Sequence, residues 1–213
     1  MMKKLLYISL LLCLFAVVGC KKELKGFDLV EHVASLKDNN AYTGYTQQIS
    51  SENTEYTKVM EYDRANNIYK YVYETKVLNP FDAEEQFTIV RNEEYYGNGL
   101  RYYLDGEIWK TEELNSSSGT SLYSFKREYF EDNMALPEIT TGDARFEGKL
   151  RDDKVDDFFG EDVNASDVNI VVVFDSLTKM LKSTTITYQT ANNETMTIIT
   201  TINYGQVSLT LPD

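Results

Sequence analysis

The feature of this 213-residue chain that most constrains its fold is an alternation of apolar and polar residues with a period of two. Tyr69, Tyr71 and Tyr73 alternate with Lys70 and Glu74, as expected of a strand with one buried and one solvated face. Similar segments begin at Tyr42. Sequences typical of turns separate them, at 64–67, 79–82, 97–99 and 105–106. The pattern predicts a run of hairpins, that is, an antiparallel meander.

The second half of the chain contains another block of predicted strands. These are 144–150, 168–174, 180–190, 194–204 and 206–211. The strand at 168–174 is apolar at successive positions, from Ile170 to Val173, which predicts a strand covered on both faces. Because the two blocks have similar strand-like residue patterns and one loop region between them, we expect one domain with a shared sheet.

Three helical segments are predicted beside the strands. Asp28 and Glu31 have capping-box spacing at the start of a helix over 28–39. Its apolar stripe consists of Leu29, Val33 and Leu36. Aromatic residues at helical spacing predict a second helix near 122–133, and 155–159 fits one short helical turn. The expected class is therefore α+β, mostly β, with the sheet packed on a few helices.

The N-terminus carries an export signal. Lys3 and Lys4 precede an apolar run over 5–18, and the run ends in Val17-Val18-Gly19-Cys20. This ending resembles the bacterial lipobox, in which the Cys thiol is joined to diacylglycerol and the peptide before it is removed. The apolar run is too short to span about 30 Å of hydrocarbon comfortably. A plain secretory peptide with an incidental cysteine is the alternative.

The lipobox divides the chain into a signal peptide at 1–19, a lipidated Cys20 with a short tether at 20–26, and a folded domain at 27–213. Two or three acyl chains would anchor the protein to the outer face of the cell membrane, or to the outer membrane if the organism has one. Lys21, rather than Asp, follows the cysteine. Since Cys13 leaves with the peptide, no disulfide can form within one mature chain.

Charge and composition exclude several function classes. The net charge is −13, and it becomes −15 once Lys3 and Lys4 are removed, which argues against a nucleic-acid partner. His32 is the sole histidine, so a Ser-His-acid triad or a zinc site lacks the residues it needs. The acidic clusters at 152–153, 156–157 and 161–162 lack calcium-loop spacing and are interpreted as a solvated edge. We expect no enzyme activity, metal or cofactor.

The order of these features resembles the superfamily of LolA and LolB carriers and the lipid-binding lipoproteins LppX and LprG. The resemblance rests on the lipobox, on Glu94-Tyr95-Tyr96-Gly97-Asn98-Gly99 followed by Ile108-Trp109-Lys110, and on Val173-Phe174-Asp175 with Lys179. It implies a curved antiparallel half-barrel with helices filling its mouth. Members of the superfamily hold acyl chains between sheet and helices. No residue of this chain matches a ligand residue of the family.

Aromatic residues supply the candidate ligand-binding positions. The chain has 16 Tyr and 10 Phe, and rings can line an apolar cavity for a lipid tail. The candidates are Met60, Tyr69, Tyr71, Tyr73 and Trp109. The alternative for each is an ordinary place in the core or on a strand, where aromatic residues are favoured.

The sequence thus supports two hypotheses for function. The first is a lipoprotein that binds or carries a lipid or another hydrophobic molecule inside a half-barrel. The second is an envelope lipoprotein that uses the same sheet to interact with a protein partner, which the sequence leaves unnamed. An apolar patch on the outer surface would favour the second hypothesis.

Overall fold

The computed structural model describes residues 25–34, 42–51, 55–78, 87–114, 123, 125–136, 142–160 and 163–212. The strands are β1 (Tyr42–Ser50), β2 (Glu55–Asp63), β3 (Ile68–Leu78), β4 (Phe87–Gly97), β5 (Leu100–Asp105), β6 (Ile108–Glu113), β7 (Asp143–Lys149), β8 (Ser166–Asp175), β9 (Leu181–Gln189) and β10 (Thr195–Tyr204). The helical elements are α2 (Phe27–Ala34), η1 (Arg127–Tyr129), η2 (Asp152–Lys154) and α3 (Val155–Phe159).

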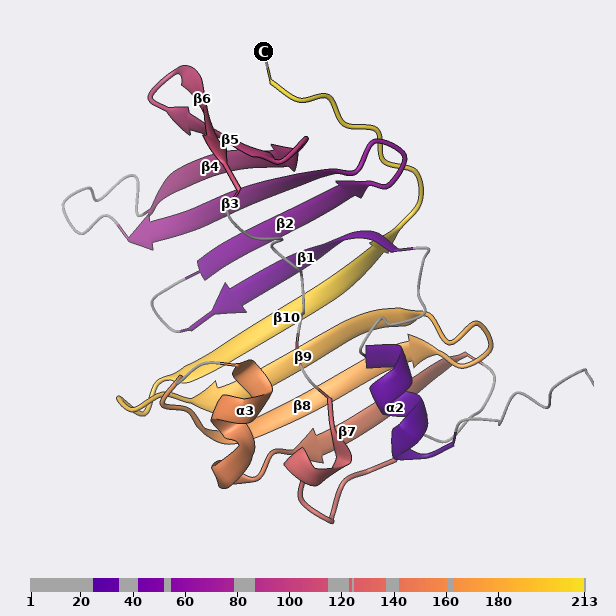
Figure 1. The fold of residues 1–213 in the computed structure, drawn as a ribbon. Helices are drawn as coiled ribbons and strands as arrows, with labels where there is room; N and C mark the ends of the chain where they lie inside the picture. The colour runs from indigo at the N-terminus through magenta and orange to yellow at the C-terminus, as the bar shows by residue number, and fades with distance from the viewer. Residues whose placement is uncertain are drawn as a thin grey trace, which may run out of the picture.

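All ten strands form one antiparallel sheet, in the order β6-β5-β4-β3-β2-β1-β10-β9-β8-β7. The chain runs outward from β1 to one edge, then returns from the other edge through β7, β8 and β9 to β10 (Figure 1). β1 and β10 pair along their length at the centre, with Tyr45 opposite Ile202 and Ile49 opposite Ile198. The two predicted strand blocks therefore share one sheet.

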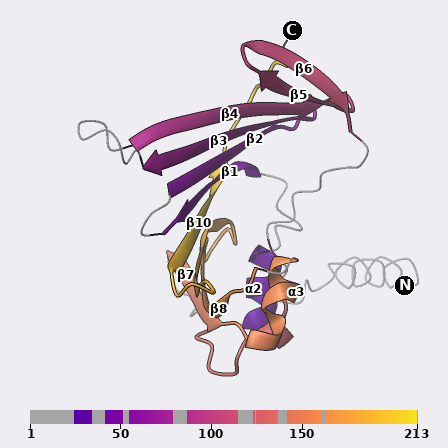
Figure 2. The same cartoon turned by 90° about the vertical axis from the view of Figure 1, so that its left-hand side faces the viewer.

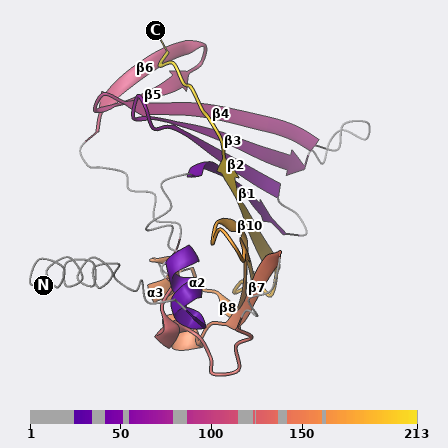
Figure 3. The same ribbon diagram turned by 90° about the vertical axis from the view of Figure 1, so that its right-hand side faces the viewer.

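The sheet is open and strongly curved. Seen edge-on in Figures 2 and 3, β1 to β4 run across the top of the β7–β10 part of the sheet, and β5 and β6 lie on the side on which α2 and α3 lie. α2 contacts β8 and β9, so the described helices pack against the β7–β10 half of the concave face. This arrangement confirms the predicted class, a mostly β protein with a curved antiparallel half-barrel and few helices.

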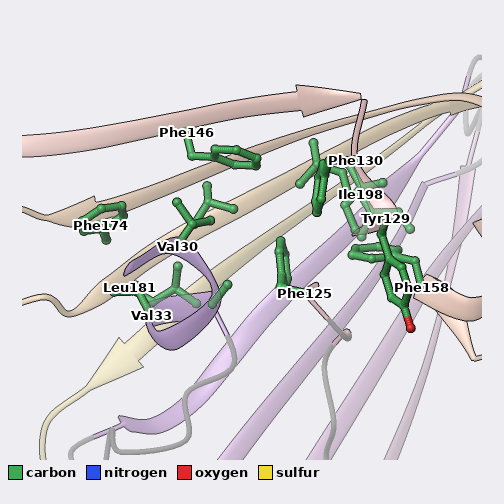
Figure 4. Close-up of a cluster of buried hydrophobic side chains, with 14 of the residues drawn as sticks. Val30, Val33, Phe125, Tyr129, Phe130, Phe146, Phe158, Phe174, Leu181 and Ile198 are labelled. Atoms are coloured by element: carbon green, nitrogen blue, oxygen red, sulfur yellow. The ribbon is translucent and has the colours of Figure 1, made fainter. Parts of the chain in front are cut away.

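An aromatic core joins the helices to this half of the sheet (Figure 4). The rings of Phe27 in α2, Phe130 after η1 and Phe146 in β7 form a triangle with centroid distances of 5.3 to 5.6 Å. Phe125 lies against Phe158 of α3 in a T-shaped contact at 5.4 Å. Edge-to-face pairs of this kind add to the free energy gained by burying the rings.

The first predicted helix is confirmed over the residues that the structure describes. α2 begins at Phe27, and Leu29 and Val33 of the predicted stripe are buried, together with Val30. The predicted continuation to Asn39, including Leu36, lies outside the described residues. The predicted turn over 155–159 is also confirmed, as α3.

The predicted helix at 122–133 is wrong for its described part. Only Arg127–Tyr129 are helical, as one 3-10 turn. After it the chain runs beside β7, where the N–H of Glu131 donates to Lys149 and the N–H of Ala135 donates to Glu147. The helical spacing of the aromatic residues arises instead from their packing, since Phe125, Tyr129 and Phe130 all point into the core.

Strand β8 is covered on one face, not on two as predicted. Its buried residues are Val168, Ile170, Val172 and Phe174. Val171 and Val173 lie on the opposite face and are only half-buried. Valine at these positions fits the strand itself, because β-branched side chains favour a pleated backbone even where they are partly solvated.

The predicted last strand at 206–211 is also wrong. Residues 206–212 have no strand structure and cross the ends of neighbouring strands. The buried carboxylate of Asp63 holds this segment, accepting hydrogen bonds from the N–H groups of Leu209 (3.0 Å), Ala65 (3.0 Å) and Asn66 (3.1 Å). These hydrogen bonds keep the pKa of Asp63 below its usual value, and the bond from Leu209 has the largest effect. Side-chain hydrogen bonding replaces a β ladder here.

Several sequence predictions lie outside the described residues. They are the signal peptide at 1–19, Cys20 and the tether to residue 24, the turn at 79–82 and the acidic pair at 161–162. Within the described part of the chain, no helix combines the length and apolar character needed to cross a membrane.

Val172→Asp is expected to destabilise the protein by about 3 kcal/mol or more. Val172 is fully buried in β8, so the variant would place a carboxylate in the aromatic core. Denaturant unfolding followed by circular dichroism measures the change. Val173→Asp is the matched control, because the neighbouring side chain is half-exposed on the opposite face, next to Arg145. Equal stability of the two variants would contradict the assigned faces.

Candidate functional site

The concave side of the sheet beyond the helices is lined by tyrosine. We call this surface the tyrosine face. It comprises Tyr45 of β1, Tyr56, Lys58 and Met60 of β2, Tyr69, Tyr71 and Tyr73 of β3, and Glu94 and Tyr96 of β4. The register places these residues on one side of the sheet, since Tyr71 lies opposite Met60 and Glu94, and Met60 lies opposite Tyr45. The same side continues through β10 into the aromatic core.

The rings of the tyrosine face contact one another. The centroid of Tyr71 lies 6.2 Å from that of Tyr73 and 5.4 Å from that of Tyr96. Tyr56 and Tyr73 are 6.3 Å apart. Tyr45 and Tyr71 are buried, whereas the other four tyrosines of the face are partly exposed. The face is therefore an aromatic layer with a packed base and accessible outer rings.

Four of the five candidate residues from the sequence share this face. Tyr69 and Tyr73 are partly buried against the core, and Tyr71 belongs to the core itself. Met60 is fully buried between Tyr45 and Tyr71. Met60 and Tyr71 thus support the face from within, and Tyr69 and Tyr73 are the candidates that a ligand could touch.

The fifth candidate, Trp109, lies on the opposite side of the sheet. Its neighbour Lys110 pairs with Tyr103, which pairs with Glu94 on the tyrosine face, so Trp109 must point to the convex side. There its indole meets the ring of Tyr95 in a T-shaped contact at 5.6 Å. The structure does not bring Trp109 together with the other four residues.

Lys58 is the cation of the tyrosine face. Its ammonium nitrogen lies 5.0 Å from the ring centroid of Tyr71, 5.6 Å from that of Tyr73 and 5.9 Å from that of Tyr45. Contact with ring faces favours a cation, but it does not replace the hydration of an ammonium group. Burial therefore lowers the pKa of Lys58, and the charge of Glu94 opposes this shift in part.

Sequence reasoning missed Lys58, although the alternation in β2 could have shown it. Tyr56, Lys58, Met60 and Tyr62 occupy every second position, so all four side chains point to one side. A lysine in an otherwise apolar and aromatic stripe was the signal.

A cluster of hydrogen-bonded polar side chains lies at the edge of the tyrosine face next to β5. Glu94 accepts a hydrogen bond from the Tyr96 hydroxyl at 2.7 Å and pairs with Arg101 at 2.5 Å. Arg101 also donates to Glu112 at 2.7 Å. Burial alone would raise the pKa of Glu94, but the hydrogen bonds from Arg101 and Tyr96 lower it overall. The rim glutamate is thus held as a carboxylate by partners of its own.

Tyr123 connects the tyrosine face with the helical half. Its hydroxyl accepts a hydrogen bond from Gln47 of β1 at 3.2 Å, and its ring stacks on Phe158 of α3 at 5.2 Å. Burial raises the pKa of Tyr123 to about 12. Tyr123 therefore links β1 to α3, through a hydrogen bond on one side and a stacked ring on the other.

Two surface grooves lie near the face and the core. The first, of about 420 Å³, separates the turn after β2 from residues 205–208. It adjoins the tyrosine face because Tyr62, in its wall, stacks on Tyr69 at 4.2 Å. The second, of about 290 Å³, lies between residues 133–135 and strands β7 and β8.

The described residues include no group of three or more His, Cys, Asp or Glu side chains placed to hold a metal ion. The acidic residues near α3 are exposed, and two of them pair with nearby cations, Asp153 with Arg151 and Asp157 with Lys154. His32 lies half-buried in α2.

Comparison with solved structures gives matches of low sequence identity. A hypothetical protein of Chlamydia trachomatis is 12% identical, with a TM-score of 0.36, over 84% of this chain and 97% of that one. LprF from Mycobacterium bovis is 11% identical, with a TM-score of 0.42, over 89% and 99%. A LolA superfamily protein from Nitrosomonas europaea is 6% identical, with a TM-score of 0.28, over 87% and 96%. No protein-family model and no curated protein matches the chain.

Tyr73→Phe is expected to make stability less sensitive to alkali. Burial, and to a smaller extent the charge of Glu94, raises the pKa of Tyr73 from 10.0 to about 12. Its contribution to stability is therefore fully present below pH 10 and is lost as the pH rises towards 12. Phenylalanine cannot ionise, so the variant should lose less stability over this range. Urea unfolding at several pH values tests this, with Tyr102→Phe as the control on the opposite face. Identical pH slopes for wild type and Tyr73→Phe would contradict the prediction.

Proposed function

We propose that the protein is a membrane-anchored, extracytoplasmic lipoprotein that binds a lipid or another hydrophobic ligand against the tyrosine face. The anchor is the acylated thiol of Cys20, after removal of residues 1–19. The tether over 20–26 is short, and it keeps the ligand-binding half-barrel close to the membrane from which an apolar ligand would come.

The observation that supports ligand binding is the arrangement of the concave face. Its β7–β10 half packs against helices, whereas its β1–β5 half presents Tyr56, Tyr69, Tyr73 and Tyr96 as partly exposed rings. Burying the remaining exposed ring surface against an acyl chain would gain about 25 cal/mol per Å². Rings also provide a rigid binding surface, which limits the entropy lost on binding.

Native mass spectrometry tests this function. The protein is the mature chain from residue 20 with Cys20→Ser, so that no acyl chain of its own competes for the face. We expect an added mass of a few hundred daltons that organic extraction recovers as lipid. The double variant Tyr69→Asp/Tyr73→Asp, which places charges among the outer rings, should lose this mass while keeping the wild-type fold by circular dichroism.

A second candidate function, an envelope protein that binds another protein, has one observation in its favour. Leu104 is 43% exposed on the convex face, in register with Trp109 and near Tyr95. Adjoining apolar side chains on a surface are the feature that marks an interaction site, whereas single exposed apolar residues are common. A clean unliganded mass in repeated preparations would favour this candidate over ligand binding.

Cys20→Ser in the full-length chain is expected to abolish acylation and to move the protein out of the membrane fraction. Without acyl chains, the remaining attraction of a strongly acidic protein for a membrane surface is small. Fractionation with metabolic labelling by a fatty acid measures both effects, and Cys13→Ser serves as the control. Membrane retention of an unacylated Cys20→Ser protein would show that the apolar segment 5–18 is the anchor.

A further inference from the structure

Lys58 occupies an unusual position for a lysine. It is half-buried in the middle of the tyrosine face, with aromatic rings of three residues around its ammonium nitrogen. In the described part of the chain its ammonium has neither an ion pair nor a hydrogen-bond acceptor. Other lysines on the sheet are paired: Lys70 lies 3.0 Å from Glu93, and Lys149 lies 2.7 Å from Asp167.

The nearest acid of the face does not fill this gap. Glu94 influences Lys58 through space, but its oxygens are engaged by Arg101 and by the Tyr96 hydroxyl. The ammonium of Lys58 therefore retains donors that water or a ligand must satisfy. Removal of that water by an apolar ligand would leave the charge unsolvated, which disfavours a ligand that is apolar throughout.

We propose that the tyrosine face selects an amphiphile whose polar end is negatively charged, with the ammonium of Lys58 bound to that anionic end and the rings in contact with its chain. This rests on the proposed ligand-binding function and adds to it the chemical class of the ligand. A carboxylate or phosphate oxygen would accept a charge-assisted hydrogen bond from Lys58. A cationic amphiphile would instead meet a like charge inside the face.

The geometry favours binding at Lys58 over binding at Arg101, the other cation nearby. Both terminal nitrogens of Arg101 already pair with carboxylates, those of Glu94 and Glu112 at 2.5 and 2.7 Å, and its remaining Nε is buried without a partner. An anion at Arg101 would have to displace one of them. At Lys58 it displaces only water, and it restores the solvation that burial has removed.

The test compares ligands that share a chain and differ in their polar end. Equilibrium dialysis of the mature chain with Cys20→Ser measures binding of dodecanoate, dodecanol and dodecylamine at neutral pH. We expect dodecanoate to bind about tenfold more tightly than dodecanol, because a hydrogen bond between charged groups contributes about that much. Dodecylamine should bind most weakly.

Variants then assign the preference to a residue. Lys58→Met should reduce the affinity for dodecanoate about tenfold and leave that for dodecanol unchanged or higher, whereas Lys58→Arg should keep the preference for the acid. Lys126→Met is the matched control, since Lys126 is exposed and lies 5.1 Å from the ring of Tyr129 outside the tyrosine face. Lys58→Gln provides the same comparison if the Met variant fails to fold.

The outcomes separate this inference from the function on which it rests. Equal binding of dodecanoate and dodecanol by the wild-type protein would overturn anion selection and leave ligand binding in place. A preference for the acid that persists in Lys58→Met and Lys58→Gln would overturn the role of Lys58. Failure of every amphiphile to bind would contradict the proposed function as well.

Discussion

The pairing of β1 with β10 is the interaction on which the rest of the structure depends. It joins residues about 150 positions apart by a ladder that runs from Tyr42 opposite Tyr204 to Ser50 opposite Thr197. Through it, the hairpins built outward from β1 and those leading back to β10 become one sheet with one concave face. Without it the tyrosine face and the aromatic core would belong to separate sheets, each with an unpaired edge.

The two halves of that concave face are stabilised in different ways. The β7–β10 half buries Phe146, Phe174 and Ile186 against helical segments, as a core normally does. In the other half, partly exposed rings stand above Met60 and Tyr71, which are buried. Tyrosine suits this half because its ring packs like an apolar residue while its hydroxyl remains in contact with water. The same chemistry makes the face stable when empty and suited to an amphiphile.

Local patterns in the sequence were sufficient to predict most strands, two helical segments and the turns at 64–67 and 97–99, because the hydrophobic period and turn residues act over a few positions. They failed where tertiary contacts replace local preference. Phe125, Tyr129 and Phe130 have helical spacing, yet backbone pairing with β7 keeps the chain that follows from continuing the helix. Leu209 and Leu211 alternate like strand residues, yet hydrogen bonding to Asp63 holds them beside the sheet.

Local patterns also predicted only part of the candidate site, namely which side chains share a face of the sheet. Alternation within β3 correctly placed Tyr69, Tyr71 and Tyr73 on one face, because every second side chain of a strand points to the same side. Placing Trp109 of β6 relative to them required three registers, β3 with β4, β4 with β5 and β5 with β6. A one-residue change in any of these moves every later side chain to the other face. Lys58 needed no such information, because it shares a strand with Met60. A charged residue at an inward position costs stability unless it has a partner, so Lys58 was the strongest functional signal in the alternating pattern, and its missing partner is the reason to expect a ligand that carries negative charge.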